Sequence, residues 1–265
     1  MSSKSVTIFI PLSRQERLNE TAMMVKSLNK GTLEVGVAIV CDNKEISHEE
    51  ILDAFAPLVP NIAHTEKEKD NETDMTIRRQ RICDVFTQGQ ELIDLSHDFV
   101  LILEDDTIVE SDALIKLIQN WDFLEQVWDT IPFKGPGIIS GVQTGRWGNR
   151  IIGAWHVDNP KDPHTVYSAS PDGSGMESVT ATGFYCCLTT PELFCSATFR
   201  HDFLGPDFFF GLDVAAKGYR NYITWDVPCI HKTRTITLHP SDANSVTTFI
   251  NEGDYWATSV DYPSL

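Results

Sequence analysis

The sequence predicts an α/β protein with a mixed, mostly parallel central sheet that is flanked by helices. Segments of strand length at Val6–Leu12, Val35–Cys41 and Phe99–Leu103 alternate with helical patterns, as in right-handed βαβ units. Phe99–Leu103 is apolar on both faces of its pleat, as expected of a central parallel strand covered by helices. From about residue 135 onward, Gly, Pro and Trp separate short strand-like segments. The second half is therefore expected to be irregular and partly antiparallel.

Three helices are expected from apolar residues that recur every three or four positions. The first follows Val6–Leu12 and ends at Lys30-Gly31, because glycine terminates helices. The second spans about 75–95. The third follows Ser111-Asp112, a pair suited to capping a helix N-terminus. Their apolar stripes are Leu18, Ala22, Val25 and Leu28; Ile82, Val85, Phe86, Leu92 and Ile93; and Leu114, Leu117, Ile118 and Trp121.

Two arginines continue the stripe of the second helix toward its N-terminus. Stepping back three and four residues from Ile82 reaches Arg79 and Arg78, so both are expected near the core-facing side of the helix. The alternative is that they pair with nearby acids while only their aliphatic stems are buried.

The second half contains short runs with strand character, at Gly137–Val142, Ile151–Val157 and Ser178–Leu188. Between them, Asn159–Gly175 is rich in Pro, Asp, Ser and Gly. Such a composition predicts a long surface loop, which makes this segment a candidate lid.

Composition narrows the class of protein. The chain has 265 residues and a formal net charge of −17, which repels nucleic acid and anionic membranes at long range. The apolar run Val6–Leu12 is shorter than a signal-peptide core or a membrane span, so a cytoplasmic protein without a transmembrane segment is expected. The six cysteines occur in no Cys-x-x-Cys spacing, which favours buried thiols over zinc ligands or disulfides.

Polar and charged residues follow the predicted parallel strands, where open α/β sheets bind ligands. They are Pro11 to Arg14, Asp42-Asn43, and Glu104-Asp105-Asp106. Three adjacent carboxylates repel one another unless a cation lies between them. Mg²⁺ and Mn²⁺ suit such oxygen ligands, and Mg²⁺ commonly binds one or two carboxylates together with substrate phosphates. A polar turn before the Ser111 cap is the simpler alternative.

Two other phosphate-binding classes are disfavoured by the residues around the first strand. A phosphate-loop NTPase requires the pattern G-x-x-x-x-G-K-[ST], and the chain contains no Gly-Lys dipeptide. A nucleotidyltransferase is expected to carry a glycine-rich loop after its first strand, whereas Ser13 to Glu16 reads Ser-Arg-Gln-Glu here.

The order of these motifs resembles a metal-dependent GT-A glycosyltransferase of the broad family-2-like group. Glu104-Asp105-Asp106 stands where that fold carries its D-x-D motif, in the EDD form. Ser178–Tyr185 (SVTATGFY) resembles the strand that lines the acceptor side. Gly205–Tyr219 resembles the "G-E-D-x-x-F … G-Y" helix, although Pro206 replaces the usual Glu, and Asp226–His231 resembles the closing "D-x-x-v-x-H" strand.

The resemblance covers about residues 6–232 and implies a single GT-A catalytic domain over 1–265. Within it, 1–110 would form the nucleotide-sugar-binding half, 111–240 the acceptor and catalytic half, and 241–265 a tail that could act as a lid. The implied donor is a nucleotide sugar, with UDP favoured over GDP. The implied acceptor is a glycan, a lipid-linked sugar, a protein or a modified nucleic acid.

The resemblance also implies catalytic and metal-binding roles. Asp106 is the expected ligand of Mn²⁺ or Mg²⁺ and His231 the second, although a lone strand histidine is often a core residue. Asp207 is the expected general base of an inverting transfer, and a cap for the following helix is its other interpretation. Arg78 is expected to offset the charge of the leaving diphosphate, with Arg14 and Lys232 as alternates.

The remaining expected contacts concern the nucleotide and the acceptor. Glu104 or Asp105 would meet the ribose, and Asp42, with Pro11 and Ser13 nearby, the base or ribose. Arg146-Trp147 and Trp155 lie in the half that should meet the acceptor, with a core position the safer assignment for Trp155. Two other functions stay open: a GT-A-like module that binds nucleotide sugar or glycan without turnover, and a metal-dependent nucleotidyltransferase.

Overall fold

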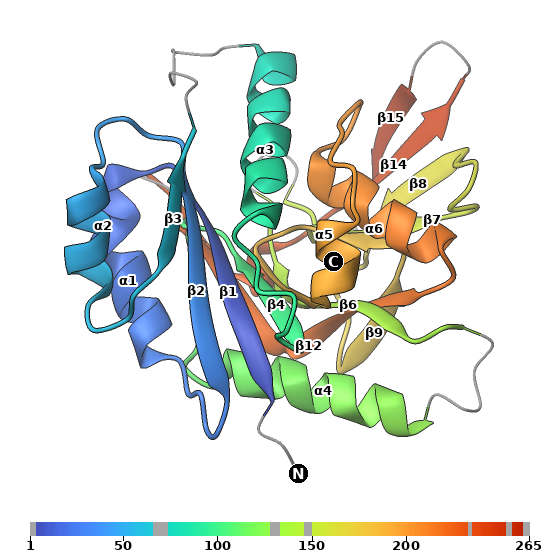
Figure 1. Cartoon of the computed structure of the whole chain (residues 1–265). Coiled ribbons are helices and arrows are strands. Elements are labelled where there is room, and N and C mark those ends of the chain that lie inside the picture. Colours follow the sequence, from blue (N-terminus) through green and yellow to red (C-terminus); the bar gives the residue numbers. More distant parts are fainter. Residues whose placement is uncertain are drawn as a thin grey trace.

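The computed structural model describes residues 4–65, 74–127, 133–145, 150–232, 235–252 and 256–261. These residues form a ten-stranded central sheet, a five-stranded second sheet and flanking helices (Figure 1). The main path of the central sheet has the order β13-β12-β6-β11-β4-β1-β2-β3, and β5 and β9 pair with β12 off this path. Within the described ranges, no helix combines the length and the apolar character needed to cross a membrane.

The first half of the central sheet is parallel, as predicted. Strand β1 pairs in parallel with both β2 and β4, and β2 pairs in parallel with β3. The bounds are β1 Ser5–Leu12, β2 Glu34–Cys41, β3 Asn61–His64 and β4 Phe99–Leu103. The connecting helices are α1 Leu18–Ser27, α2 His48–Phe55 and α3 Met75–Gln90, and α4 Ala113–Val127 follows β4.

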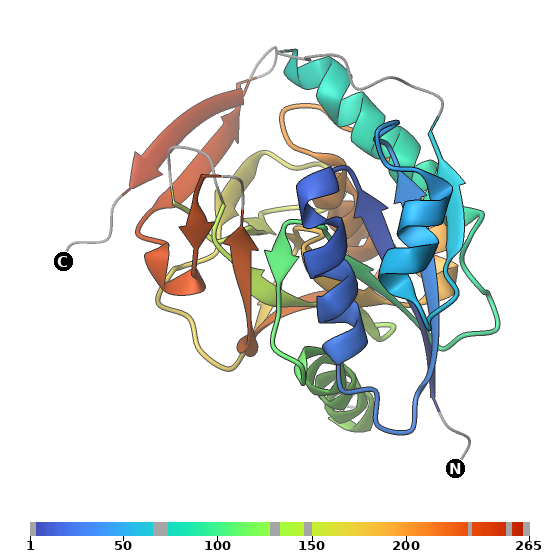
Figure 2. The same cartoon turned by 90° about the vertical axis from the view of Figure 1, so that its left-hand side faces the viewer.

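Alternation along β1 explains the layering. Ile8 and Ile10 pack in one core cluster with residues of α1, α2 and α4, whereas Phe9 packs in a second cluster with Cys83 and Phe86 of α3. Successive side chains of a strand point to opposite faces, so the sheet is covered on both sides. Figures 1 and 2 show α1 and α2 lying side by side over one face of the sheet.

The second half mixes strand directions. Strand β11 (Cys186–Thr189) is antiparallel to both β4 and β6 (Pro136–Gln143), whereas β12 (Arg220–Lys232) is parallel to β6. Strands β5 (Thr107–Ile108), β9 (Met176–Val179) and β13 (Thr237–Leu238) pair with β12 in antiparallel fashion. Helices α5 (Pro191–Cys195) and α6 (Pro206–Ala216) lie between β11 and β12 in sequence.

The second sheet was not predicted as such. Its order is β10-β7-β8-β14-β15, and all of its ladders are antiparallel. The bounds are β7 Ala154–Val157, β8 Thr165–Ser168, β10 Ala181–Thr182, β14 Val246–Asn251 and β15 Trp256–Asp261. The β14–β15 hairpin lies across the molecule from α1 and α2 (Figures 1 and 2).

Several local predictions need correction. The helix expected at about 75–95 ends at Gln90, and Leu92 donates its N–H to Gly89 in the turn that follows. The segment expected as one loop, 159–175, contains β8, in which buried Val166 and Ser168 alternate with less buried neighbours. The strand expected at Ser178–Leu188 is divided among β9, β10 and β11. The tail 241–265 contributes two strands to the second sheet.

Candidate functional site

Two adjoining cavities lie at the carboxyl ends of the parallel strands. The small cavity, about 90 Å³, is lined by residues at the ends of β1, β2 and β4 and by one side of α3. The large cavity, about 480 Å³, lies between the central sheet, α6 and the second sheet. Arg78, Ile82 and Glu104 line both, so a ligand that extends from one cavity into the other would pass these three side chains.

Asp105 holds the turn that follows β1. Its Oδ2 accepts hydrogen bonds from the backbone N–H groups of Ser13, at 2.8 Å, and Arg14, at 2.9 Å. Its Oδ1 pairs with the Arg14 guanidinium. The residue is 1% exposed; burial raises the pKa of this carboxyl, and the Arg14 charge opposes that rise. Asp105 therefore joins the ends of β4 and β1.

The Arg14 guanidinium lies between two of the three acids. Besides its pair with Asp105, Arg14 Nη2 lies 2.8 Å from Asp106 Oδ2. From the sequence, Mg²⁺ or Mn²⁺ was expected to offset these like charges, whereas in this structure the Arg14 guanidinium contributes positive charge beside Asp105 and Asp106. Glu104 alone of the three acids lines both cavities.

His231 approaches Asp106 from β12. Its Nε2 lies 3.2 Å from Asp106 Oδ2, and its Nδ1 lies 3.2 Å from the carbonyl oxygen of Thr144. The pairing of β5 with β12 sets this contact, because it places His231 opposite Thr107. Both neighbours of the ring are hydrogen-bond acceptors, and a neutral imidazole has one N–H to donate. An N–H donated to Thr144 leaves the Nε2 lone pair facing the carboxylate.

That arrangement suits a divalent cation. A histidine that donates one ring N–H to a backbone carbonyl and turns its other nitrogen toward a carboxylate is oriented as metal ligands usually are. Within the described residues, no group of three or more His, Cys, Asp or Glu side chains is arranged to hold a metal ion. Asp106 and His231 would supply two ligands to Mg²⁺ or Mn²⁺, with phosphate oxygens completing the coordination. Such binding requires Asp106 Oδ2 to exchange its contact with Arg14 Nη2 for the cation.

Asp207 lies in the first turn of α6, after Gly205 and Pro206. A Cβ at Gly205 would come within 2.5 Å of Asp207 Oδ1, so the absence of a side chain at 205 makes room for the carboxylate. Burial raises the pKa of Asp207 to about 6, against the opposing effects of the Phe208 and Asp207 backbone N–H groups and the Arg79 charge. With a pKa of about 6, the Asp207 carboxyl is mostly ionised at neutral pH although it is largely removed from water.

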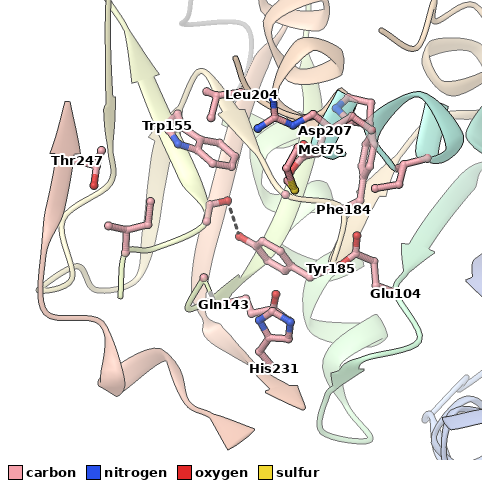
Figure 3. Close-up of a pocket in the computed structure, with 18 of the residues that line it drawn as sticks. Met75, Glu104, Gln143, Trp155, Phe184, Tyr185, Leu204, Asp207, His231 and Thr247 are labelled. Carbon is pink, nitrogen blue, oxygen red and sulfur yellow. Dashed lines mark hydrogen bonds between the residues drawn. The ribbon is translucent and has the colours of Figure 1, made fainter. Parts of the chain in front are cut away.

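The large cavity brings Asp207 and His231 together with aromatic side chains of the second sheet and of the turn between β10 and β11. Figure 3 shows Asp207, Glu104 and His231 around the same cavity as Trp155 and Tyr185. Arg78 and Arg79 line it from the start of α3. The Arg79 guanidinium also donates from Nη1 to the carbonyl oxygen of Asp202, at 2.6 Å, and so links α3 to the segment before α6.

The structure brings most of the predicted site residues together. Lys232 is the exception: it lines neither cavity, and its Nζ lies 2.8 Å from Glu20 Oε1 of α1. Arg146-Trp147 lies outside the described residues. Predicted residues that line the small cavity are Pro11, Ser13, Arg14, Asp42, Arg78, Glu104, Asp105 and Asp106; those that line the large cavity are Arg78, Glu104, Trp155, Asp207 and His231.

Sequence reasoning missed Arg81 and the contribution of β14. Arg81 Nε lies 3.0 Å from Asp42 Oδ2, and both side chains are nearly buried in the lining of the small cavity. Arg81 follows Arg78 by three residues, and this spacing places the two arginines next to each other on one face of a helix. That spacing could have identified Arg81 as a site residue from the sequence. Thr247 and Phe249 of β14 line the large cavity. In the sequence, only the spacing of two residues between them, which places both on one face of a short strand, could have indicated that they face the same site.

Comparison with known proteins identifies the fold. No protein-family model matches the chain, and no curated protein matches its sequence. The structure of S. aureus TarS 1–349 in complex with UDP-GlcNAc is similar, with a TM-score of 0.56, 11% identity, and coverage of 90% of this chain and 61% of that chain. The corresponding UDP complex has a TM-score of 0.54 and 11% identity, with coverage of 84% of this chain and 58% of that one.

A longer TarS structure has a TM-score of 0.54 and 10% identity, with 84% of this chain and 35% of that chain covered. The chain thus spans between about a third and three fifths of the TarS chains that it matches. At these identities the likeness concerns the fold alone. It confirms the predicted fold class: the protein has a GT-A-like glycosyltransferase fold with a mixed, mostly parallel central sheet and flanking helices.

Proposed function

We propose that the chain is a divalent-metal-dependent glycosyltransferase that moves a sugar from a nucleotide sugar to an acceptor hydroxyl, with inversion and with Asp207 as the base. The observation that supports this most is the position of Asp207, a carboxyl with a pKa raised to about 6. It lines the same cavity as Glu104 and His231, next to the polar small cavity. Because TarS has been solved with UDP and with UDP-GlcNAc, a UDP-sugar is the favoured donor.

In this proposal the small cavity binds the nucleoside and the region between the cavities binds the diphosphate. Asp42, held by Arg81, receives hydrogen bonds from the base or ribose, and Glu104 receives those from the ribose. Arg78 faces the diphosphate. Asp106 and His231 would hold Mn²⁺ or Mg²⁺, which when bound would supply positive charge to the diphosphate.

The chemical step is a single displacement. The acceptor hydroxyl oxygen forms a bond to the anomeric carbon, its proton passes to Asp207, and the bond from that carbon to the diphosphate oxygen breaks. A base with a pKa near the working pH combines the correct ionisation state with the capacity to accept a proton. The departing diphosphate gains negative charge, which the guanidinium of Arg78 offsets.

The direct test is nucleoside diphosphate release from UDP-, GDP- and dTDP-sugars in the presence of Mn²⁺. We expect release from at least one UDP-sugar, because slow hydrolysis accompanies glycosyl transfer when water replaces the acceptor. Removal of divalent cations with EDTA should abolish release, and added Mn²⁺ should restore it. The binding of UDP in the presence of Mn²⁺ should be measured by calorimetry, for the wild type and for the two variants described next.

Asp106→Asn is the informative variant for this test, and Asp98→Asn is its matched control, since Asp98 is exposed at the other end of β4. Asp106→Asn should weaken Mn²⁺-dependent UDP binding by tenfold or more, and Asp98→Asn should leave it unchanged. Metal-dependent UDP binding without turnover of any donor would instead identify a nucleotide-sugar-binding module. Pyrophosphate release from a nucleoside triphosphate would identify a nucleotidyltransferase.

The rate of transfer should depend on pH through Asp207. A general base acts only when deprotonated, and burial has raised this pKa to about 6 from the ordinary value of 3.8. We therefore expect kcat/KM to be constant above about pH 7 and to fall tenfold per pH unit below about pH 6. Because the Arg79 charge lowers this pKa, Arg79→Gln should move the acid limb to higher pH. A limb near pH 4 in both proteins would contradict the assignment.

A further inference from the structure

The large cavity beyond Asp207 is lined mainly by apolar and aromatic side chains. They come from several segments of both halves of the chain, and they include Met75, Trp155, Phe184, Tyr185, Leu204 and Phe249. Figure 3 shows the rings of Trp155, Phe184 and Tyr185 gathered around the space next to Asp207. Aromatic faces at this density favour a flat, weakly polar occupant.

Several polar side chains of this lining already form hydrogen bonds with other groups of the protein. The Tyr185 hydroxyl contacts the carbonyl oxygen of Gly153 at 3.2 Å and Thr182 Oγ1 at 3.0 Å. Gln143 Nε2 donates to Thr107 Oγ1 at 2.8 Å. These groups therefore serve to hold the lining in place.

Among the uncharged polar side chains that the structure describes in this lining, two buried atoms lack such a partner. Trp155 Nε1 on β7 and Thr247 Oγ1 on β14 have no hydrogen-bond partner among the described residues. The two residues are 9% and 3% exposed, and both line the large cavity. In Figure 3 the indole nitrogen lies on the edge of the ring toward the strand that carries Thr247. Buried polar atoms are nearly always paired in folded proteins, so an unpaired donor and hydroxyl here indicate that a ligand completes them.

Together these observations limit how polar the acceptor can be. A sugar ring carries several hydroxyls, each of which can donate one hydrogen bond and accept two. The proposed function assigns Arg78, Glu104 and His231 to the diphosphate, the ribose and the metal, and Arg79 is bonded to the Asp202 carbonyl. Trp155 Nε1, Thr247 Oγ1 and Asp207 are therefore left for the acceptor, and they could satisfy only a small part of that demand. A planar aromatic body with one accepting atom and one nucleophilic hydroxyl would match both the apolar lining and its two unpaired atoms.

We propose that the acceptor is such an aromatic alcohol, with the indole N–H of Trp155 donating to its accepting atom, the hydroxyl of Thr247 beside it and its hydroxyl at Asp207. This acceptor class rests on the proposed function. In the transfer, the alcohol oxygen gains the bond to the anomeric carbon, the diphosphate leaves, and the proton goes to Asp207. The glycan and lipid-linked sugar acceptors that the sequence allowed are thereby disfavoured.

The test measures acceptor binding without donor or metal, so that it does not depend on turnover. NMR titrations would compare 4-methoxybenzyl alcohol, whose ether oxygen can accept from Trp155, with methyl β-glucopyranoside. We expect the alcohol to bind at least tenfold more tightly than the glucoside. Trp155→Phe and Thr247→Val should each weaken the binding of the alcohol by about threefold to tenfold, the usual effect of losing one hydrogen bond.

Matched controls come from the same chain. Trp225 also has an indole nitrogen without a described partner, but it lines neither cavity. Thr248 is the next residue on β14 and is absent from both linings. Trp225→Phe and Thr248→Val should leave the affinity for the alcohol unchanged, and Thr247→Ser, which keeps the hydroxyl, should retain most of it. Thermal midpoints would identify a variant that fails to fold.

Three results would overturn this inference: no binding of the alcohol, a glucoside that binds as tightly as the alcohol, or wild-type affinity for the alcohol in both Trp155→Phe and Thr247→Val. Binding of UDP with Mn²⁺, measured on the same samples, reports separately on the proposed function. Intact UDP binding with no binding of the alcohol would refute the acceptor class alone. Binding of the alcohol with no UDP binding would refute the donor side of the proposed function.

Discussion

Asp207→Asn should lower kcat for glycosyl transfer by about 10²- to 10⁴-fold, the usual contribution of a positioned general base. The amide keeps the shape of the carboxylate but cannot accept the proton of the acceptor hydroxyl. Affinity for the nucleotide sugar should change little, because Asp207 lines only the large cavity. Steady-state kinetics with the best donor from the panel, together with calorimetric UDP binding, would measure both quantities.

The same variant should be more stable than the wild type at pH 8. Burial raises the pKa of Asp207 from 3.8 to about 6, so its ionised form is disfavoured in the folded state, and that cost is present above about pH 6. A shift of about two pKa units corresponds to at most about 3 kcal/mol, and less where the carboxylate faces a cavity. Below about pH 4 the protonated acid is neutral, as is the amide, and the difference should vanish.

Asp213→Asn is the matched control for Asp207→Asn. Asp213 lies on the same helix, but it pairs with the Arg200 guanidinium on the surface, at 2.8 Å from Nη2. This variant should keep wild-type kcat and gain no stability at pH 8. Near wild-type transfer by Asp207→Asn would remove Asp207 as the base. A lower stability for Asp207→Asn at pH 8 would instead indicate that the carboxylate mainly caps α6.

The local sequence pattern was sufficient to predict the strands of the first half of the fold, but it did not predict the second sheet. The runs that became β1, β2 and β4 are apolar on both faces and lie between helical stripes, so each can be recognised without its partners. Strand β8 is four residues long and contains a polar alternation that also occurs in loops. Its strand character depends on pairing with β7 and β14, and β14 lies about 80 residues further along the chain. Such pairing follows from register rather than from local preference.

The candidate site was predictable in its location but not in all of its contacts. Polar residues after parallel strands predicted where the small cavity would lie. The repulsion among the three acids was expected to be offset by Mg²⁺ or Mn²⁺, and the structure adds Arg14 as a positive neighbour. The identity of that neighbour depends on the register of β1 with β4, which pairs Phe9 with Ile102 and so brings the two strand ends together. In that register Arg14 contacts both Asp105 and Asp106.

Asp105→Ala should destabilise the protein by about 3–5 kcal/mol, the usual cost of breaking a buried ion pair by removing one partner. The change removes the acceptor of the Ser13 and Arg14 backbone N–H groups and one of the two carboxylates around the Arg14 guanidinium. Asp105→Asn keeps an oxygen acceptor for those N–H groups and should cost less. Urea unfolding monitored by circular dichroism would give both free energies.

Asp98 provides the control, because its Oδ2 accepts from the backbone N–H and the hydroxyl of Ser5 at the opposite end of β1. Asp98 is exposed and pairs with no guanidinium among the residues that the structure describes, so Asp98→Ala should cost no more than about 1.5 kcal/mol. The comparison also decides between the two roles open to Asp105. If Asp105 holds the β1 turn, its substitution lowers the stability of the protein in the absence of ligand. If Asp105 instead binds the ribose, its substitution lowers the affinity for UDP and leaves the free protein as stable as before. Since Asp105 is enclosed and hydrogen-bonded on both oxygens, we expect the first result, and Glu104→Gln should give the second.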